Sequence, residues 1–137
     1  MKIENKIVVR YRDGKIKKGH TYDFFPNRPV FHLTAMEGEQ EIIEINLSEL
    51  KALFFVKSFE GSKDHPRFDD QAISERLKTM PGLKLEVTFF DGEKMYGTSQ
   101  GYDPTRKGFF LFLADQDVND ERVFVIKEST ISVKVLQ

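Results

Sequence analysis

The sequence has no cysteine and no excess of charge of either sign. Without cysteine, the chain has neither a disulfide framework nor a thiolate metal site. Its 21 basic and 22 acidic side chains give a net charge of −1, which argues against a strongly basic nucleic-acid-binding protein. No apolar run approaches the roughly 20 residues that span a bilayer, and the first residues lack the apolar stretch of a signal peptide. We therefore expect a cytoplasmic protein with no membrane partner.

An internal repeat organises the 137 residues. When the chain is shifted by 78 positions, Asp13-Gly14 aligns with Asp91-Gly92 and Gly19 aligns with Gly97. The register holds without a gap over residues 6–33, and after a loop it resumes with a slip of one or two residues. A match of this length predicts an internal duplication, so that the fold contains two related units.

Each copy has the pattern of five short strands. Apolar and polar residues alternate on both sides of an Asp-Gly pair, which favours a two-residue hairpin turn. The glycine inside the second strand predicts a bend of the kind that helps a small barrel to close. The predicted strands are residues 6–12, 15–24, 29–34, 41–47 and 52–59 in the first copy, and 84–90, 93–102, 108–113, 122–126 and 131–136 in the second.

One short helix is expected between the copies. Residues 69–80 begin with two aspartates, carry apolar residues at helical spacing and end at Pro81-Gly82. The sequence therefore predicts a mainly β fold of tandem five-stranded SH3-like/Sm-like barrels that pack together, because each barrel alone would have a marginal core. The predicted division is a first barrel at residues 1–59, a linker and helix at 60–82, and a second barrel at 83–137.

Two motifs carry a family resemblance. V-x-Y-x-DG-x-I-x-x-G in the first copy and V-x-F-x-DG-x-x-x-x-G in the second resemble the first half of an Sm or Sm-like domain. The stretches DFFPNRPVFHL and GYDPTRKGFFLF more closely resemble an uncharacterised bacterial domain family that accompanies signalling modules such as PilZ. This resemblance implies the fold and brings almost no function with it. The Arg-Gly pair of Sm proteins is absent, and only Asn27 stands where those proteins have a base-recognising asparagine.

The repeated Pro-x-Arg-x-x-Phe motif is the most specific feature of the chain. It places Arg28 and Arg106 at equivalent loop positions, where a guanidinium can bind a phosphate or carboxylate with two hydrogen bonds. In the alternative interpretation, which we favour here, each arginine only fixes its own loop through Asp23 or Asp103. The motif is thus a candidate anion site or a folding requirement kept in both copies.

The first hairpin is basic, with seven lysines and arginines among residues 2–18. A basic strand surface suits a sequence-independent contact with nucleic acid. The five glutamates among residues 37–49 oppose this interpretation, because they can neutralise the patch within the same copy. The candidate nucleic-acid residues of this hairpin are Arg10, Arg12, Lys15 and Lys17.

The second copy replaces those charges with apolar residues. Phe90, Met95 and Tyr96 stand where the first copy has Arg12, Lys17 and Lys18. We expect the three side chains to face outward on one surface and to be covered either by the first copy or by a second chain or partner. They are the candidate protein-interface residues.

No catalytic or metal-binding pattern is present in the sequence. The loop that begins at Asp115 resembles a calcium loop but lacks its glycine and final glutamate, and the three histidines have no ligand spacing. The predicted function is therefore a non-catalytic binding or regulatory module, without cofactor, that recognises a protein partner or itself in bacterial signalling. The alternative is an RNA or nucleotide-phosphate binder that uses the basic hairpin, Arg28 and Arg106. An enzyme ranks below both.

Overall fold

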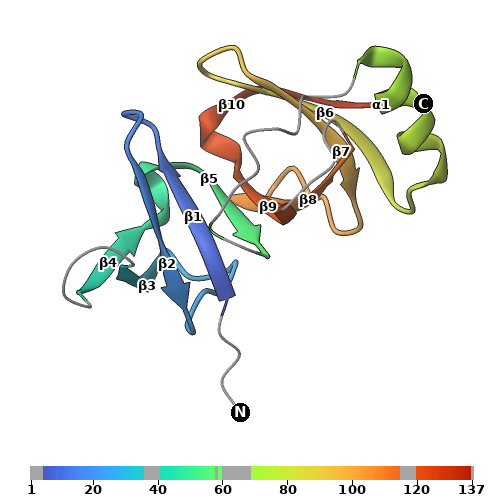
Figure 1. Ribbon diagram of the computed structural model, residues 1–137. Coiled ribbons are helices and arrows are strands. Elements are labelled where there is room, and N and C mark those ends of the chain that lie inside the picture. The colour runs from blue at the N-terminus through green and yellow to red at the C-terminus, as the bar shows by residue number, and fades with distance from the viewer. Residues whose placement is uncertain (1–4, 36–40, 58, 60–68, 115–119, 137) are drawn as a thin grey trace.

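The computed structural model describes residues 5–35, 41–57, 59, 69–114 and 120–136 (Figure 1). In this part of the chain, ten strands, one α-helix and two short 3-10 helices follow one another. Their bounds are β1 Asn5–Tyr11, β2 Ile16–Thr21, β3 Val30–Ala35, β4 Ile42–Asn46, η1 Leu47–Glu49, β5 Leu50–Val56, α1 Asp70–Thr79, β6 Leu83–Phe89, β7 Lys94–Ser99, β8 Gly108–Leu113, β9 Asp120–Ile126, η2 Lys127–Ser129 and β10 Thr130–Val135.

The strands form where the sequence alternates. Alternate side chains are apolar and buried at Ile7 and Val9 in β1 and at Leu85, Val87 and Phe89 in β6, and the residues between them are half-buried. The turns after these strands contain Gly14 and Gly92, with φ of 94° and 90°, a conformation in which other residues are strained. Both predicted hairpins are therefore confirmed.

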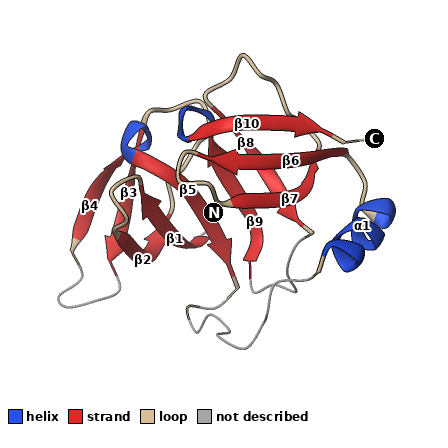
Figure 2. Ribbon diagram, turned by 90° about the horizontal axis from the view of Figure 1, so that it is seen from above, coloured by secondary structure: helices blue, strands red, loops and turns tan. Residues whose placement is uncertain are grey.

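All ten strands belong to one antiparallel sheet with the order β10-β6-β7-β8-β9-β5-β1-β2-β3-β4 (Figure 2). The first half, β1–β5, and the second half, β6–β10, have the same internal strand order. The sequence predicted two barrels packed side by side, whereas the structure has one continuous open sheet. The halves are joined because β5, the last strand of the first, pairs with β9, the fourth strand of the second.

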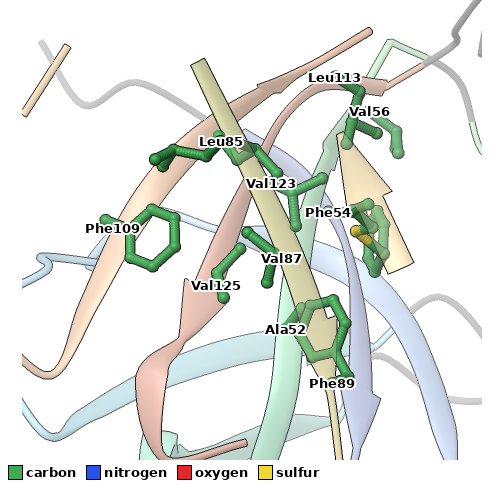
Figure 3. Close-up of a cluster of buried hydrophobic side chains, with 12 residues drawn as sticks. Ala52, Phe54, Val56, Leu85, Val87, Phe89, Phe109, Leu113, Val123 and Val125 are labelled. Atoms are coloured by element: carbon green, nitrogen blue, oxygen red, sulfur yellow. The ribbon is translucent and has the colours of Figure 1, made fainter. Parts of the chain in front are cut away.

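The two central strands, β5 and β9, each supply side chains to two hydrophobic cores. Phe54 and Val123 belong to the core of the second half, which Figure 3 shows with its side chains pointing toward one another. Phe55 and Phe124 point to the other side of the sheet and belong to the core of the first half. All seven residues of β5 are consequently buried, so its sequence shows no alternation of apolar and polar residues.

A buried lysine joins the two halves through hydrogen-bonded ion pairs. The Lys51 ammonium donates hydrogen bonds of 2.7 Å to Asp91 and 2.7 Å to Glu93 in the β6–β7 turn. Burial by itself lowers the pKa of Lys51, but these two hydrogen bonds outweigh it and the net shift is upward. The hydrogen bond from Lys51 is also the main reason that the pKa of Asp91 lies below its ordinary value. Lys51 is thus held charged at the junction.

Ser129 makes a second polar contact across the junction. Its hydroxyl donates to the Leu50 carbonyl at 2.6 Å and accepts a hydrogen bond from the Arg12 guanidinium at 2.7 Å. Ser129 is buried, so both of its partners are fixed in position. The end of β1, the start of β5 and η2 are therefore tied at one point.

Helix α1 begins where the sequence predicts it. The Asp69 side chain accepts a hydrogen bond from the Ala72 N–H and caps the helix, while Ile73 and Leu77 are buried near Ala114. The predicted linker before it, residues 60–68, lies outside the described residues. In the described part of the chain, no helix has the length and apolar character to cross a membrane.

Gly97 has no room for a side chain, and this predicts a stability effect. An added Cβ would lie 2.2 Å from the Phe112 carbonyl oxygen of the neighbouring strand, whereas an added Cβ at Gly101 meets nothing within 4 Å. We expect Gly97→Ala to lower the free energy of unfolding by about 1–3 kcal/mol, as overpacking does. Gly101→Ala should change it by less than about 0.5 kcal/mol. Equal denaturation midpoints for the two variants would contradict the close approach of β7 and β8.

Lys51→Ala tests the polar lock at the junction. We expect the substitution to lower the free energy of unfolding by about 1–3 kcal/mol near pH 7. This is less than for a fully buried pair, because the carboxylates are half-exposed. The lowered pKa of Asp91 means that its contribution is present above its unfolded value of 3.8 and is lost as the pH falls through the folded value. The difference in the free energy of unfolding between wild type and Lys51→Ala should therefore become smaller in acid.

The matched control for Lys51→Ala is Lys15→Ala, which removes an exposed lysine 3.7 Å from Asp13 in the equivalent turn of the first half. This variant should cost less than about 0.5 kcal/mol, as exposed ion pairs do. Urea denaturation of both variants at several pH values measures the effect. A Lys51→Ala loss that is independent of pH down to about pH 2 would show that Asp91 has no part in it.

Candidate anion-binding groove

The two repeated arginines end turns of the same form. The Arg28 N–H donates to the Phe25 carbonyl at 3.0 Å, and the Arg106 N–H donates to the Asp103 carbonyl at 3.1 Å. Pro26 and Pro104 are the second residues of these turns, where the fixed φ of proline is favourable. The prolines therefore set both turns, as the sequence predicts.

Backbone hydrogen bonds anchor each arginine loop to the 3-10 helix of its own half. The Leu47 N–H donates to the Pro29 carbonyl at 2.9 Å, and the Lys127 N–H donates to the Lys107 carbonyl at 2.9 Å. The Lys127 ammonium also donates to the carbonyl of Pro104. Because η1 and η2 flank the central strands, both loops are held close to the β5–β9 junction.

Both loops line one groove of about 1110 Å³ between the two halves. Among the described residues, its charged lining comprises Arg28, Arg106, Lys107 and Arg122 against a single acid, Glu128. Phe112, which is 38% exposed, offers an aromatic surface to the groove. The full lining consists of residues 26–29, 46–48, 99–101, 105–110, 112, 122, 124, 126 and 128.

Arg122 lies in the floor of this groove on β9. Its guanidinium carbon is 4.5 Å from the centre of the Phe55 ring and 4.8 Å from that of Phe110, so it stacks on both. Its Nε atom is buried and has no hydrogen-bond partner among the described residues. Arg122 was not among the residues predicted from the sequence, because the repeat has Ile42 at the equivalent position and alternation alone does not show which face borders the other half.

The two loop arginines differ in how they are held. The Arg28 guanidinium lies 4.8 Å from the centre of the Phe25 ring, while Arg106 lies 3.8 Å from the Asp103 carboxylate and is 73% exposed. Hydrogen bonds from Thr105, followed by the charge of Arg106, lower the pKa of Asp103. The expectation that Asp103 holds Arg106 is therefore confirmed. Both arginines also line the groove.

The corresponding expectation for Asp23 and Arg28 is wrong. The Asp23 carboxylate instead accepts a hydrogen bond of 2.9 Å from the His32 N–H and contacts the His32 ring at 2.7 Å. Burial raises the pKa of Asp23, but these contacts with His32 and a hydrogen bond from Thr21 outweigh it and lower the pKa overall. The Thr21 hydroxyl donates to the His32 carbonyl and not to the ring, so the three residues form a structural clip without the geometry of a catalytic triad.

Comparison with known protein families gives one match. Residues 3–137, nearly the whole chain, match the Family of unknown function (DUF6982). The chain belongs to this family. Comparisons with curated proteins and with solved structures found no match. The family assignment therefore supplies no activity, and the DUF6982 fold must be interpreted from its own groove and surfaces.

In this DUF6982 chain the basic hairpin is not a single patch. Arg10 stacks on Phe54 at 4.9 Å, Arg12 pairs with Glu128 at 3.6 Å, and Lys17 lies 5.3 Å from the centre of the Tyr11 ring. Lys15 pairs with Asp13, as noted above. None of the four candidates lines the groove. The hairpin cations serve packing and the junction, and Arg12 is neutralised by an acid of the second half.

The prediction that Phe90, Met95 and Tyr96 share an outward face is wrong. Met95 is 5% exposed and belongs to the core of the second half, because consecutive residues of a strand point to opposite faces. Tyr96 is half-buried against the cluster that holds α1. Phe90 alone of the three is widely exposed, at 45%.

Three other sequence features lie outside the described residues, in whole or in part. The loop at residues 115–119, which resembles a calcium site, lies outside the described residues, as do His65 and the glutamates at 37 and 39. Among the residues that are described, no group of three or more histidines and carboxylates is placed to hold a metal ion. The groove is therefore the candidate site of this structure.

Proposed function

We propose that this protein is a non-catalytic binding module that takes a phosphate-bearing nucleotide, free or as part of a single-stranded RNA, in the groove between its halves. The observation that carries this proposal is that Arg28 and Arg106, far apart in the sequence, line the same groove together with Arg122. Their guanidiniums are suited to phosphate oxygens, which they can bind with two parallel hydrogen bonds.

The aromatic part of the groove suits a base. Phe112 is 38% exposed on β8, and stacking of a base on an aromatic side chain contributes about 1–3 kcal/mol. The volume of about 1110 Å³ is slightly above the range of about 300–1,000 Å³ for small-molecule sites. A ligand with more than one phosphate or base therefore fits it better than a lone anion.

The distribution of charge supports an anionic ligand although the net charge is −1. Glu128 is the single acid of the lining, and its carboxylate already pairs with Arg12 at 3.6 Å. The basic residues Arg28, Arg106 and Lys107 are exposed on the loops. Local charge, which governs the contact, is thus positive where the global charge is not.

We prefer this function to recognition of an unrelated protein partner, the function that the sequence alone favoured. That hypothesis relied on exposed strand edges and on one apolar face made by Phe90, Met95 and Tyr96, and these three side chains do not share a face. The proposal keeps the idea of a regulatory module in bacterial signalling. It also takes the two halves as copies of one SH3-like/Sm-like unit, which the shared strand order supports.

The test is binding of a fluorescent single-stranded RNA of about ten nucleotides to the whole chain, measured by anisotropy at several salt concentrations. We expect Arg28→Ala/Arg106→Ala to weaken binding at least about tenfold, since each charge-assisted hydrogen bond is worth about 1.5–3 kcal/mol. The log-log salt slope should fall by about 1.4, which is two contacts at about 0.7 each. Phe112→Ala should weaken binding of RNA and ATP but not of inorganic tripolyphosphate.

The matched control is Lys15→Ala/Lys17→Ala, which removes the same charge from the first hairpin outside the groove and should change affinity by less than about twofold. Competition by ATP at concentrations that displace the RNA would identify a free nucleotide as the ligand, and failure of ATP to compete would identify a strand. Equal losses in the two double variants would refute the groove as the site. So would the absence of RNA and ATP binding at about 50 mM salt.

A further inference from the structure

Two strands at the ends of the sheet lack a partner on one side. In the described part of the chain, β4 pairs only with β3, and β10 pairs only with β6. Figure 1 shows the two strands in different halves of the molecule, β4 at the far left and β10 above the second half. Open strand edges are templates for pairing with another chain unless side chains prevent it.

The outward backbone groups of β10 can be identified from the hydrogen bonds on its inner side. In antiparallel strands, alternate residues direct both N–H and C=O to the same neighbour. The Leu136 N–H donates to the carbonyl of Lys84 in β6, so the backbone groups of Lys134, two residues earlier, also point toward β6. Val133 and Val135 therefore direct their N–H and C=O groups to the open edge.

The same argument applies to β4. The Leu47 N–H donates to the Pro29 carbonyl, and the Ala35 N–H donates to the Glu41 carbonyl, so the odd-numbered residues point toward β3. Ile42 and Glu44 consequently direct their N–H and C=O groups to the open edge. Each edge thus presents at least two residues with unpaired backbone groups.

The repeat allows the register of the β5–β9 pair to be transferred to these two edges. Residues of β4 and β5 align with those of β9 and β10 at a shift of 80 positions, which superposes Leu47–Glu49 on Lys127–Ser129. In the β5–β9 pair, Leu53 lies opposite Phe124 and Phe55 lies opposite Arg122. Transferred by this shift, Val133 would lie opposite Glu44, and Val135 opposite Ile42, of a second molecule. These are the same four residues whose backbone groups are free.

The side chains near the two edges are apolar and exposed, as expected of a contact surface without its partner. Phe90, Ile131 and Val135 on one edge are 45%, 69% and 53% exposed, and Ile42 on the other is 70% exposed. Their equivalents at the internal junction are all engaged there: Arg12 with Ser129, Lys51 with Asp91, and Phe55 and Arg122 with each other. At the two end strands of the sheet, the positions equivalent to these junction residues are therefore apolar and exposed.

Charge favours the pairing of unlike edges. The β4 edge carries Glu44 and the β10 edge carries Lys134, both exposed. Two β4 edges, or two β10 edges, would bring like charges together, which is a common protection against edge association. In the transferred register Lys134 lies opposite Ile43 of the second molecule, so its side chain and that of Glu44 point to opposite faces of the sheet. The pairing of β10 with β4 therefore brings no two like charges opposite each other.

We propose that β10 of one molecule pairs with β4 of a second molecule of this protein, in the register of the internal β5–β9 junction. The contact is heterologous, so repetition gives either a closed ring or an open filament. Ile42, Glu44, Val133 and Val135 are not part of the groove lining, so the pairing and the proposed ligand use different residues.

Sedimentation velocity of the whole chain over about 5–500 µM tests the proposal with two variants. Val135→Pro removes an outward N–H of β10 and Ile42→Pro removes an outward N–H of β4, while the inward hydrogen bonds of both strands remain. Wild type should exceed 15.9 kDa as concentration rises, and each variant alone should stay at 15.9 kDa. An equimolar mixture of the two variants has one open edge of each kind and should form a dimer of about 32 kDa, twice 15.9 kDa.

The control Ile16→Lys changes an isoleucine that is 51% exposed away from both edges and should associate like wild type. Circular dichroism establishes that each variant is folded, and Val135→Lys and Ile42→Lys replace any proline variant that is not. Wild type that stays monomeric at about 500 µM would overturn the proposal. A variant that self-associates like wild type, or a mixture that remains monomeric while wild type associates, would do so as well.

Discussion

The pairing of β5 with β9 is the contact on which the rest of the structure depends. Each of these strands places alternate side chains in the core of the first half and in the core of the second. A core side chain of this size contributes about 1.5–3 kcal/mol on burial, so separation of the strands would expose one wall of both cores at once. Lys51 and Ser129 reinforce the same contact with buried hydrogen bonds across it. The two halves are therefore expected to unfold as one unit, even though each repeats the same strand order.

The groove is a consequence of this junction. The arginine loops are tied to η1 and η2, and these short helices directly precede β5 and β10 in the two halves. Once β5 and β9 are paired, Arg28 and Arg106 come to line the same space, and Arg122 on β9 becomes its floor. The proline and backbone of the Pro-x-Arg-x-x-Phe motif thus form the turn. Its arginine lines the groove, where we propose the contact with an anion.

Local patterns in the sequence predict much of this fold. Alternation, the Asp-Gly turns and the Asp69 cap place the strands, the hairpins and the helix, because each depends on residues close together in the chain. The sharing of β5 and β9 could not be predicted in the same way, since a run of apolar residues shows burial but not the neighbour that causes it. Met95 and Tyr96 were placed on one face by comparison of the copies, against the two-residue period of a strand. Arg28 and Arg106 were found through the repeat, and Arg122 was not because its counterpart is Ile42.

Taken together, the two proposals predict one continuous anion-binding surface along an assembly of molecules. The relation between the halves at the β5–β9 junction would recur between molecules at the β10–β4 contact, because both use the same register. The loop of Arg106 would then stand beside the loop of Arg28 in the next molecule, as the two loops stand within one chain. An assembly would carry arginine loops at regular intervals along one rim, and an anionic strand could contact several of them in succession. Since each phosphate contact adds about 0.7 to the salt slope, a strand bound along an assembly would show a steeper slope than the same strand on a single molecule. Binding of long strands and self-association would therefore strengthen each other, whereas a free nucleotide held in one groove would bind equally well to both forms.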